Sequence, residues 1–246
     1  MHRNMNVLFF DIDGTLALGL DVPVSAKEAI ALTRSRGNLV FICTGRPLPY
    51  VKKHFSEYAD GYICFNGRFA EVNDEIIYDV PLSDELLKQL IKRLDELKLG
   101  YDFSNNEGNY SGGIIEGKYQ KPEYEDKILY NFNLHFKDYA QYDEACEKLK
   151  DLCIFNPHYP HLHADTTIIG SDKGQAIKAV TERLDIPFEN TYAFGDGAND
   201  VCMLQAVAHG VAMGNGLKET KEAAEYVTAD IDDDGIAKAL AHYGLI

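Results

Sequence analysis

The stretch that decides the fold is Asn6–Leu16, NVLFFDIDGTL, in which an apolar run from Val7 to Phe10 leads directly into Asp11 and Asp13. A short run that is apolar on both faces is typical of a central strand in a parallel sheet. Side chains at the carboxyl end of such a strand emerge into the crevice where open α/β sheets bind ligands. Two carboxylates at this point therefore indicate a polar site, although the stretch taken alone is equally consistent with a simple turn.

Similar apolar runs recur along the chain and alternate with helical patterns, which predicts an α/β fold with a mainly parallel, Rossmann-like sheet. The predicted strands are NVLFF, NLVFIC, YICF, TYAFG and GVAM. The first helix is expected to begin at a capping box formed by Ser25 and Glu28 and to end at Gly37. Further helices are expected in PLPYVKKHFSEYAD and DKGQAIKAVTERLDIP.

The middle of the chain has a different pattern. Ser83–Gly100 predicts an amphipathic helix with a serine cap, and a second helix is expected at about 138–153. The segments YNFNLHF and HLHADTTIIG alternate as half-exposed antiparallel strands do. We therefore expect an α+β unit at 81–167, inserted into an α/β core formed by 1–80 and 168–246.

Composition limits the possible functions. The chain has 246 residues, a net charge of −15 and five scattered cysteines. The acidic balance argues against nucleic acid and against an anionic membrane surface as partners. Without a secretory cysteine framework, a signal peptide or an apolar run long enough to cross a membrane, we expect a cytoplasmic protein that is a monomer or a homodimer.

Three further segments bring chemistry to the same edge of the predicted sheet. In CTGRP, Thr44 supplies a hydroxyl, Gly45 allows close approach of the backbone, and Arg46 adds a cation; a plain helix start is the alternative. Lys173 begins a predicted helix, where a cation opposes the helix dipole. TYAFGDGAND ends a strand with Asp196 and Asp200, carboxylates of the type that Mg²⁺ prefers. Together these groups match what phosphoryl transfer requires.

These motifs, FFDIDGTL, CTGRP, DKGQAI and GDGANDVCML, together with CFNG before the insert, resemble those of the haloacid dehalogenase (HAD) superfamily of phosphohydrolases. Their order and spacing are similar to the Cof-type subgroup, which has an inserted α+β (C2B-type) cap. The resemblance spans the whole chain. It implies that 81–167 is a cap domain that closes over the site.

The resemblance also implies roles for individual residues. Asp11 would be the nucleophile that forms an aspartyl-phosphate, and Asp13 the general acid and base. Asp11, the backbone carbonyl of Asp13, and Asp196 would hold Mg²⁺. The remaining roles are phosphate binding by Thr44, Gly45, Lys173 and Asn199, and support of the metal site or of Lys173 by Asp200.

Four residues are candidate substrate contacts: Arg46, Asn66, Arg68 and His163. The last belongs to His161-x-His163-x-Asp165, which shares one strand face and suggests either a zinc site or, in our preferred interpretation, a polar open face. A third possibility is that His163 contacts the leaving group of the substrate.

The sequence thus predicts a Mg²⁺-dependent phosphomonoesterase acting on a small phosphorylated metabolite, with a sugar phosphate favoured by the resemblance. One alternative is a phosphosugar mutase, in which the phospho-aspartate passes its phosphoryl group to another hydroxyl. The other is a non-catalytic sensor of phosphorylated metabolites.

Overall fold

The computed structural model describes residues 5–115, 117–124, 126–158 and 162–246, and the chain divides into two compact units. The first unit comprises the chain up to Asp79 together with Asp172–Ile246, and the second is Val80–Ser171. The sequence analysis placed the second unit at 81–167. No helix in the described ranges has both the length and the apolar character that a membrane span requires.

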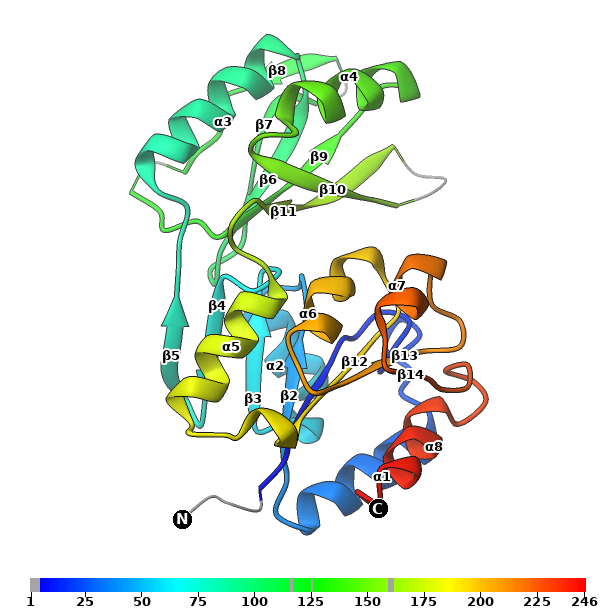
Figure 1. Cartoon of the computed structure of the whole chain (residues 1–246). Helices are drawn as coiled ribbons and strands as arrows, with labels where there is room; N and C mark the ends of the chain where they lie inside the picture. Colours follow the sequence, from blue (N-terminus) through cyan, green and yellow to red (C-terminus); the bar gives the residue numbers. More distant parts are fainter. Residues whose placement is uncertain (1–4, 116, 125, 159–161) are drawn as a thin grey trace. The chain divides into compact units, whose positions relative to one another are not determined.

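The described part of the first unit contains an eight-stranded sheet (Figure 1). In spatial order its strands are β14 (Tyr226–Val227), β13 (His209–Ala212), β12 (Thr191–Gly195), β1 (Val7–Phe10), β2 (Leu39–Cys43), β3 (Gly61–Cys64), β4 (Phe69–Val72) and β5 (Glu75–Asp79). The strands from β14 to β3 pair in parallel, whereas β4 and β5 extend the sheet in antiparallel fashion. The predicted α/β class with a parallel core is confirmed.

Helices cover this sheet because its strands are apolar on both faces. They are α1 (Val24–Ser35), α2 (Leu48–Phe55), α5 (Lys173–Arg183), α6 (Val201–Gln205), α7 (Lys218–Ala223) and α8 (Gly235–His242), with 3₁₀ turns at Ser56–Tyr58, Phe188–Asn190 and Ala198–Asp200. Side chains of α5 and α6, such as Ile177 and Met203, pack against the face that carries Val7 and Phe9. The central strand β1 is fully buried, which fixes the position at which Asp11 leaves the sheet.

The expected capping box at the start of α1 is wrong. The helix begins at Val24 with Pro23 in the N-cap position, and no side chain caps it. Ser25 therefore lies inside the first turn. Proline is well suited to a helix start because its φ is fixed in the helical range and the amide hydrogen it lacks would have no partner there.

The second unit is built on a separate, fully antiparallel sheet with the strand order β10-β11-β9-β6-β7-β8 among the described residues. Its strands are β6 (Gly100–Ser104), β7 (Asn109–Ile115), β8 (Lys118–Gln120), β9 (Asn131–His135), β10 (Cys153–His158) and β11 (His163–Ile168). Helices α3 (Asp84–Glu96) and α4 (Tyr139–Leu149) lie along one face of this sheet (Figure 1). As predicted, Ser83 caps α3, its hydroxyl accepting a hydrogen bond from the amide of Leu86.

The core of the second unit lies between these two helices and the sheet. Leu90 and Leu94 of α3 pack with Tyr101 and Phe103 of β6. The residues that alternate with these in β6 have their partners on the other face, where Asp102 is paired in register with both Ser111 and Asn133. The second unit therefore has one helix-covered apolar face and one polar face.

Candidate active site

The candidate site lies where three adjacent parallel strands end. Asp11 follows β1, Thr44 follows β2 and Asp196 follows β12. Since Phe10 is in register with both Ile42 and Phe194, the residue after each strand reaches the same edge of the sheet. This is the edge at which open α/β sheets bind ligands, and the strand order brings the predicted motifs to it.

A buried lysine joins two carboxylates at the centre of the site. The Lys173 Nζ lies 2.7 Å from Asp11 Oδ1 and 2.6 Å from Asp200 Oδ1. Only 1% of the Lys173 side chain is exposed, and α5 carries it into the site as its first residue. Burial opposes its charge, but Asp11 and Asp200 raise the pKa of Lys173 well above its ordinary value. These two carboxyl groups therefore favour the protonated form of Lys173.

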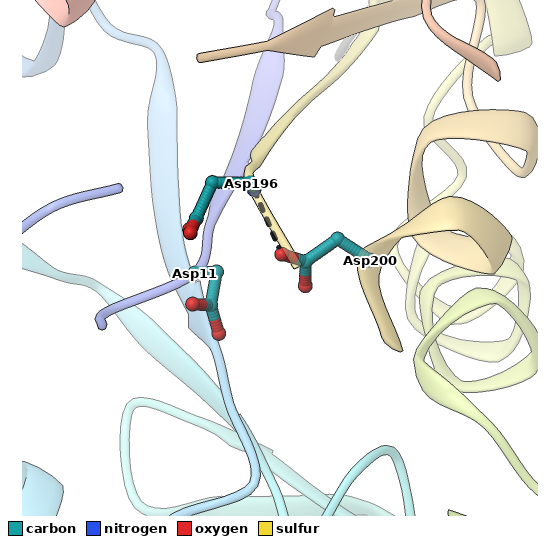
Figure 2. Close-up of side chains that lie close together, drawn as sticks. All are labelled: Asp11, Asp196 and Asp200. Carbon is teal, nitrogen blue, oxygen red and sulfur yellow. Dashed lines mark hydrogen bonds between the residues drawn. The ribbon is translucent and has the colours of Figure 1, made fainter. Parts of the chain in front are cut away.

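The three carboxylates of Asp11, Asp196 and Asp200 converge (Figure 2), each offering an oxygen within 4.8 Å of the others. Burial raises the pKa of Asp11 to about 8, although Lys173 acts in the opposite direction. Burial likewise raises the pKa of Asp196 to about 6. Three carboxyl groups share this space with one ammonium group, and hard oxygen donors of this kind fit a divalent cation such as Mg²⁺.

Asp200 has a second task in addition to its contact with Lys173. Its Oδ2 accepts hydrogen bonds from the backbone amides of Asp196 and Gly197, both at 2.9 Å, and Figure 2 marks the first of these. The side chain of Asp200 is fully buried. It therefore holds the loop that carries Asp196 and the ammonium group of Lys173 at the same time.

The Asp13 carboxylate lies outside this acidic cluster. It forms a bidentate ion pair with Arg46, with Nε 3.0 Å from Oδ2 and Nη2 3.1 Å from Oδ1. Both side chains are almost half exposed, and the guanidinium carbon of Arg46 lies 5.2 Å from the ring centroid of Tyr50. The expectation that Asp13 binds the metal through its backbone carbonyl stays a prediction. Arg46, expected at the substrate, here orients Asp13.

Three of the predicted phosphate-binding residues, Thr44, Gly45 and Asn199, lie beside Asn66. The amide of Asn66 donates to the carbonyl of Thr44 at 3.1 Å, and the Asn199 side chain donates to Asn66 Oδ1 at 3.3 Å. A Cβ on Gly45 would lie 3.0 Å from the same oxygen, so glycine permits the close approach. Asn66 itself has a left-handed backbone, with φ of +54°.

Two expected substrate contacts are buried in the structure. The exposed fraction is 2% for Asn66 and 4% for Arg68, and burial lowers the pKa of Arg68. Burial of this degree favours a positioning role for Asn66. Its backbone amide contacts Thr44 and its side-chain oxygen contacts Asn199, so the residue links the two loops. The direct contact of Asn66 and Arg68 with a substrate stays a prediction.

The fourth expected substrate contact, His163, belongs to the second unit. It pairs in register with His135, and the two rings are 6.4 Å apart between centroids. His161 of the predicted histidine motif lies outside the described residues. Within the described ranges, Asp11, Asp196 and Asp200 form the one group of three potential metal ligands, and neither His163 nor Asp165 belongs to it.

The role of Thr15 was not predicted from the sequence. Its hydroxyl donates to Asp196 Oδ1 at 2.7 Å, and the residue is fully buried. It thereby joins the loop after β1 to the loop after β12. Its position in the DIDGT loop is the available sequence signal, but only the folded chain shows which acceptor the hydroxyl reaches.

Comparisons with known proteins show the family of the chain. Residues 8–240 match the family model described as haloacid dehalogenase-like hydrolase. A putative phosphatase from Bacillus subtilis, YkrA, is 34% identical over 256 residues, covering 98% of both chains. The 5-amino-6-(5-phospho-D-ribitylamino)uracil phosphatase YcsE of the same organism is 28% identical, covering 98% of this chain and 97% of its own.

Solved structures give the same result. The HAD subclass IIB sugar phosphatase BT4131 is 30% identical, with a TM-score of 0.81, and the match covers 98% of this chain and 100% of that one. The phosphatase BT1666 from Bacteroides thetaiotaomicron has a TM-score of 0.85 at 25% identity, covering 100% of this chain and 97% of its own.

Proposed function

The chain belongs to the haloacid dehalogenase-like hydrolase family and is a phosphatase, and from this premise we propose that it is a Mg²⁺-dependent phosphomonoesterase acting through an aspartyl-phosphate. The observation that carries the proposal is the convergence of Asp11, Asp196 and Asp200, the first and last of which also contact the buried ammonium group of Lys173. This arrangement offers a nucleophile together with charges that can hold a phosphoryl group.

In the first step, a carboxylate oxygen of Asp11 attacks phosphorus, and the bond from phosphorus to the ester oxygen breaks. The leaving alkoxide takes a proton from the carboxyl group of Asp13. In the second step, the Asp13 carboxylate accepts a proton from water, whose oxygen attacks the phosphorus of the aspartyl-phosphate. Inorganic phosphate leaves, and the Asp11 carboxylate is regenerated.

Other residues of the chain hold the reacting groups. Lys173 fixes one oxygen of Asp11 and carries a positive charge toward the phosphoryl group. Arg46 orients the Asp13 carboxylate through two hydrogen bonds, and one of them must open for Asp13 to take up the proton that it gives to the leaving alkoxide. Mg²⁺, bound by Asp11, Asp196 and the backbone carbonyl of Asp13, would offset the negative charge of the phosphate and polarise its oxygens.

We propose a phosphorylated sugar or sugar-like metabolite as the substrate. Two relatives support this choice, one named as a sugar phosphatase and one as a phosphatase of a ribityl compound. The polar face of the second-unit sheet also supports it, because Asp102, Asn133 and Asp165 are neighbours in register and offer groups that bind hydroxyls. We propose that the second unit is the cap that selects the leaving group. The free thiols of all five cysteines support a cytoplasmic location.

The test is a phosphate-release screen over phosphorylated metabolites, with and without Mg²⁺, in which Asp11→Asn is the inactive control. We expect release by the wild type only with Mg²⁺ and none by the variant. Full activity of Asp11→Asn would refute the mechanism. Transfer of the phosphoryl group to a second hydroxyl without release would identify a mutase instead.

The role of the second unit has its own test. His163→Ala should change selectivity among phosphate esters while leaving turnover of a small generic ester intact. An equal loss on every ester would argue against substrate contact at His163.

A further inference from the structure

A single segment, 213–220, forms hydrogen bonds with the backbone of two acidic loops. These are the loop after β1, which carries Asp11 and Asp13, and the loop after β12, which carries Asp196 and Asp200. The segment begins after β13 and runs into the first turn of α7. Its hydrogen bonds to these loops run from Met213 N to Gly195 O (2.9 Å), from Leu217 N to Asp196 O (2.8 Å), from Thr220 Oγ1 to Gly197 O (2.8 Å) and from Asn215 Nδ2 to Gly14 O (2.8 Å). Each acceptor is a main-chain carbonyl next to, or belonging to, a predicted site residue.

The fit of the segment against the Asp196 loop is close. A Cβ on Gly216 would lie 3.1 Å from both the Cα and the carbonyl oxygen of Asp196. A side chain at this position would therefore push the two backbones apart. The segment thus combines hydrogen bonds with backbone contact at the loop that carries the proposed metal ligand.

Asn215 uses both ends of its side-chain amide. While its Nδ2 donates to Gly14, its Oδ1 accepts from the amide of Ile231 at 2.9 Å. The Nδ2 group faces an acceptor and the Oδ1 atom faces a donor, so a rotation of the amide by 180° would break both hydrogen bonds. Although the residue is exposed, its side chain is fixed between two backbone segments.

These contacts close a circuit that contains both acidic loops. Asn215 holds the carbonyl of Gly14, the next residue, Thr15, donates its hydroxyl to Asp196, and the carbonyl of Asp196 accepts from Leu217, two residues after Asn215. A loop that is tied at both ends has fewer conformations available. The distance between the loop of Asp11 and the loop of Asp196 therefore depends on the Asn215 contact.

We infer that Asn215 is a positioning residue for the corner formed by Asp11 and Asp196, acting through its hydrogen bond to Gly14. This inference rests on the proposed function, in which these two carboxylates hold the metal. It assigns a task to the sequence MGNG, 213–216, which follows β13 and carries no acidic or basic side chain.

The test compares Asn215→Ala with Asn190→Ala. Asn190 also donates its side-chain amide to a backbone carbonyl, that of Met5 at 3.2 Å, but it is the last residue of the 3₁₀ turn at Phe188–Asn190, before β12, whereas the acidic loop follows β12. We expect Asn215→Ala to lower kcat by about three- to tenfold, the range that one hydrogen bond accounts for, with little change in KM. It should weaken Mg²⁺ binding, measured by calorimetry without substrate, by a similar factor.

Asn190→Ala should leave kcat and the Mg²⁺ affinity at their wild-type values, while it changes the melting temperature about as much as Asn215→Ala does. A double variant, Asn215→Ala with Thr15→Val, adds a second criterion, because two breaks in one circuit should cost less than the sum of the single effects. If Asn215→Ala matches Asn190→Ala in Mg²⁺ affinity and kcat, the inference is overturned. If the wild type releases no phosphate, the proposed function fails, while the Mg²⁺ affinities still decide the role of Asn215.

Discussion

The ammonium nitrogen of Lys173 lies 2.7 Å from Oδ1 of Asp11, although 162 residues separate them in the chain. A second carboxylate, that of Asp200, lies 2.6 Å from the same nitrogen. Because all three side chains are buried or nearly so, water does not screen this contact. The ammonium group therefore holds two buried carboxyl groups by hydrogen bonds, and the stability of the site depends on it.

Replacing Lys173 with methionine should destabilise the protein severely. Methionine has a similar shape but leaves the carboxylates of Asp11 and Asp200 buried without their cation, and breaking a buried ion pair in this way costs about 3–5 kcal/mol. Urea unfolding measures the change in free energy. Phosphatase activity should be lost as well.

Adding Asp200→Asn to Lys173→Met provides the control. The second change replaces one of the two carboxyl groups left without their ammonium partner by a neutral amide, so the double variant should be more stable than Lys173→Met alone. A double variant as unstable as the sum of both single variants would contradict the proposed compensation.

Gly14→Ala should impair the site more than the fold. A Cβ at Gly14 would lie 2.4 Å from Asp196 Oδ2, so the carboxylate of Asp196 would have to move. The backbone of Gly14 is also left-handed, with φ of +89°, which costs a residue with a side chain about 1–2 kcal/mol. We expect at least about a tenfold loss of kcat, the effect of little more than 1 kcal/mol at the transition state.

The matched control is Gly19→Ala. Gly19 has a φ of +66°, but a Cβ there would meet nothing within 4 Å. It should show the backbone cost in thermal unfolding and keep its kcat. Equal losses of activity in the two variants would show that the movement of Asp196 is not the cause.

Mg²⁺ should raise the melting temperature of the protein in the absence of substrate. The folded chain brings Asp11, Asp196 and Asp200 together, whereas the unfolded chain does not, so the ion binds the folded state preferentially. At a concentration one hundred times its Kd the ion adds about 2.7 kcal/mol of stability. Differential scanning fluorimetry in EDTA and in Mg²⁺ measures the shift.

Asp196→Asn should reduce this shift strongly. Asp165→Asn, in the second unit, should not, because Asp165 lies outside the group of three carboxylates. An undiminished shift in Asp196→Asn would place the ion elsewhere.

The ion pair of His135 and Asp102 should make the stability of the second unit depend on pH. His135 Nε2 lies 2.5 Å from Asp102 Oδ2. The hydrogen bond raises the pKa of His135 above its ordinary 6.5 and lowers the pKa of Asp102 below its ordinary 3.8. The pair therefore contributes fully between pH 3.8 and 6.5. Its contribution is lost as the pH rises through the raised pKa of His135 or falls through the lowered pKa of Asp102.

His135→Gln should thus cost more free energy of unfolding at pH 5.5 than at pH 9, a window set by these two pKa shifts. Since 48% of the His135 side chain is exposed, the difference should stay below about 1 kcal/mol. Arg93→Gln, which breaks the pair with Asp151 in the same unit, should cost the same at both pH values because arginine keeps its charge. If the cost of His135→Gln did not depend on pH, the proposed contribution of the His135–Asp102 ion pair to stability would be refuted.

The elements that the sequence predicts best are those whose physics is local. The strands β1, β2, β3, β12 and β13 were predicted because each is a continuous apolar run. The same holds for α3, whose Ser83 cap and apolar stripe both lie within the helix and its first flanking residue. The capping box at Ser25 failed because Pro23 offers an equally local start that competes with it.

In the candidate site, too, features that depend on local sequence were predicted and features that depend on distant contacts were not. The residue types and the order of the motifs indicated a phosphoryl-transfer site, because carboxylates, a hydroxyl and a lysine together supply the nucleophile, the metal ligands and the cation that this reaction requires. The pairing of Asp13 with Arg46, the bond from Thr15 to Asp196 and the position of Asn215 were not predictable. Each depends on how two loops that are distant in sequence meet.

By itself, the sequence thus determined the class of the fold, the central position of β1 and the set of groups that gather at its end, because burial of an apolar run fixes where the next residues emerge. Only the tertiary structure decided which of these groups pair with one another. It places the carboxylate of Asp11 against Lys173 and that of Asp13 against Arg46, although the two aspartates are neighbours in the same loop. The physical reason is that charge pairing and hydrogen bonding act over a few ångströms in space, and the chain brings their partners together only when it folds.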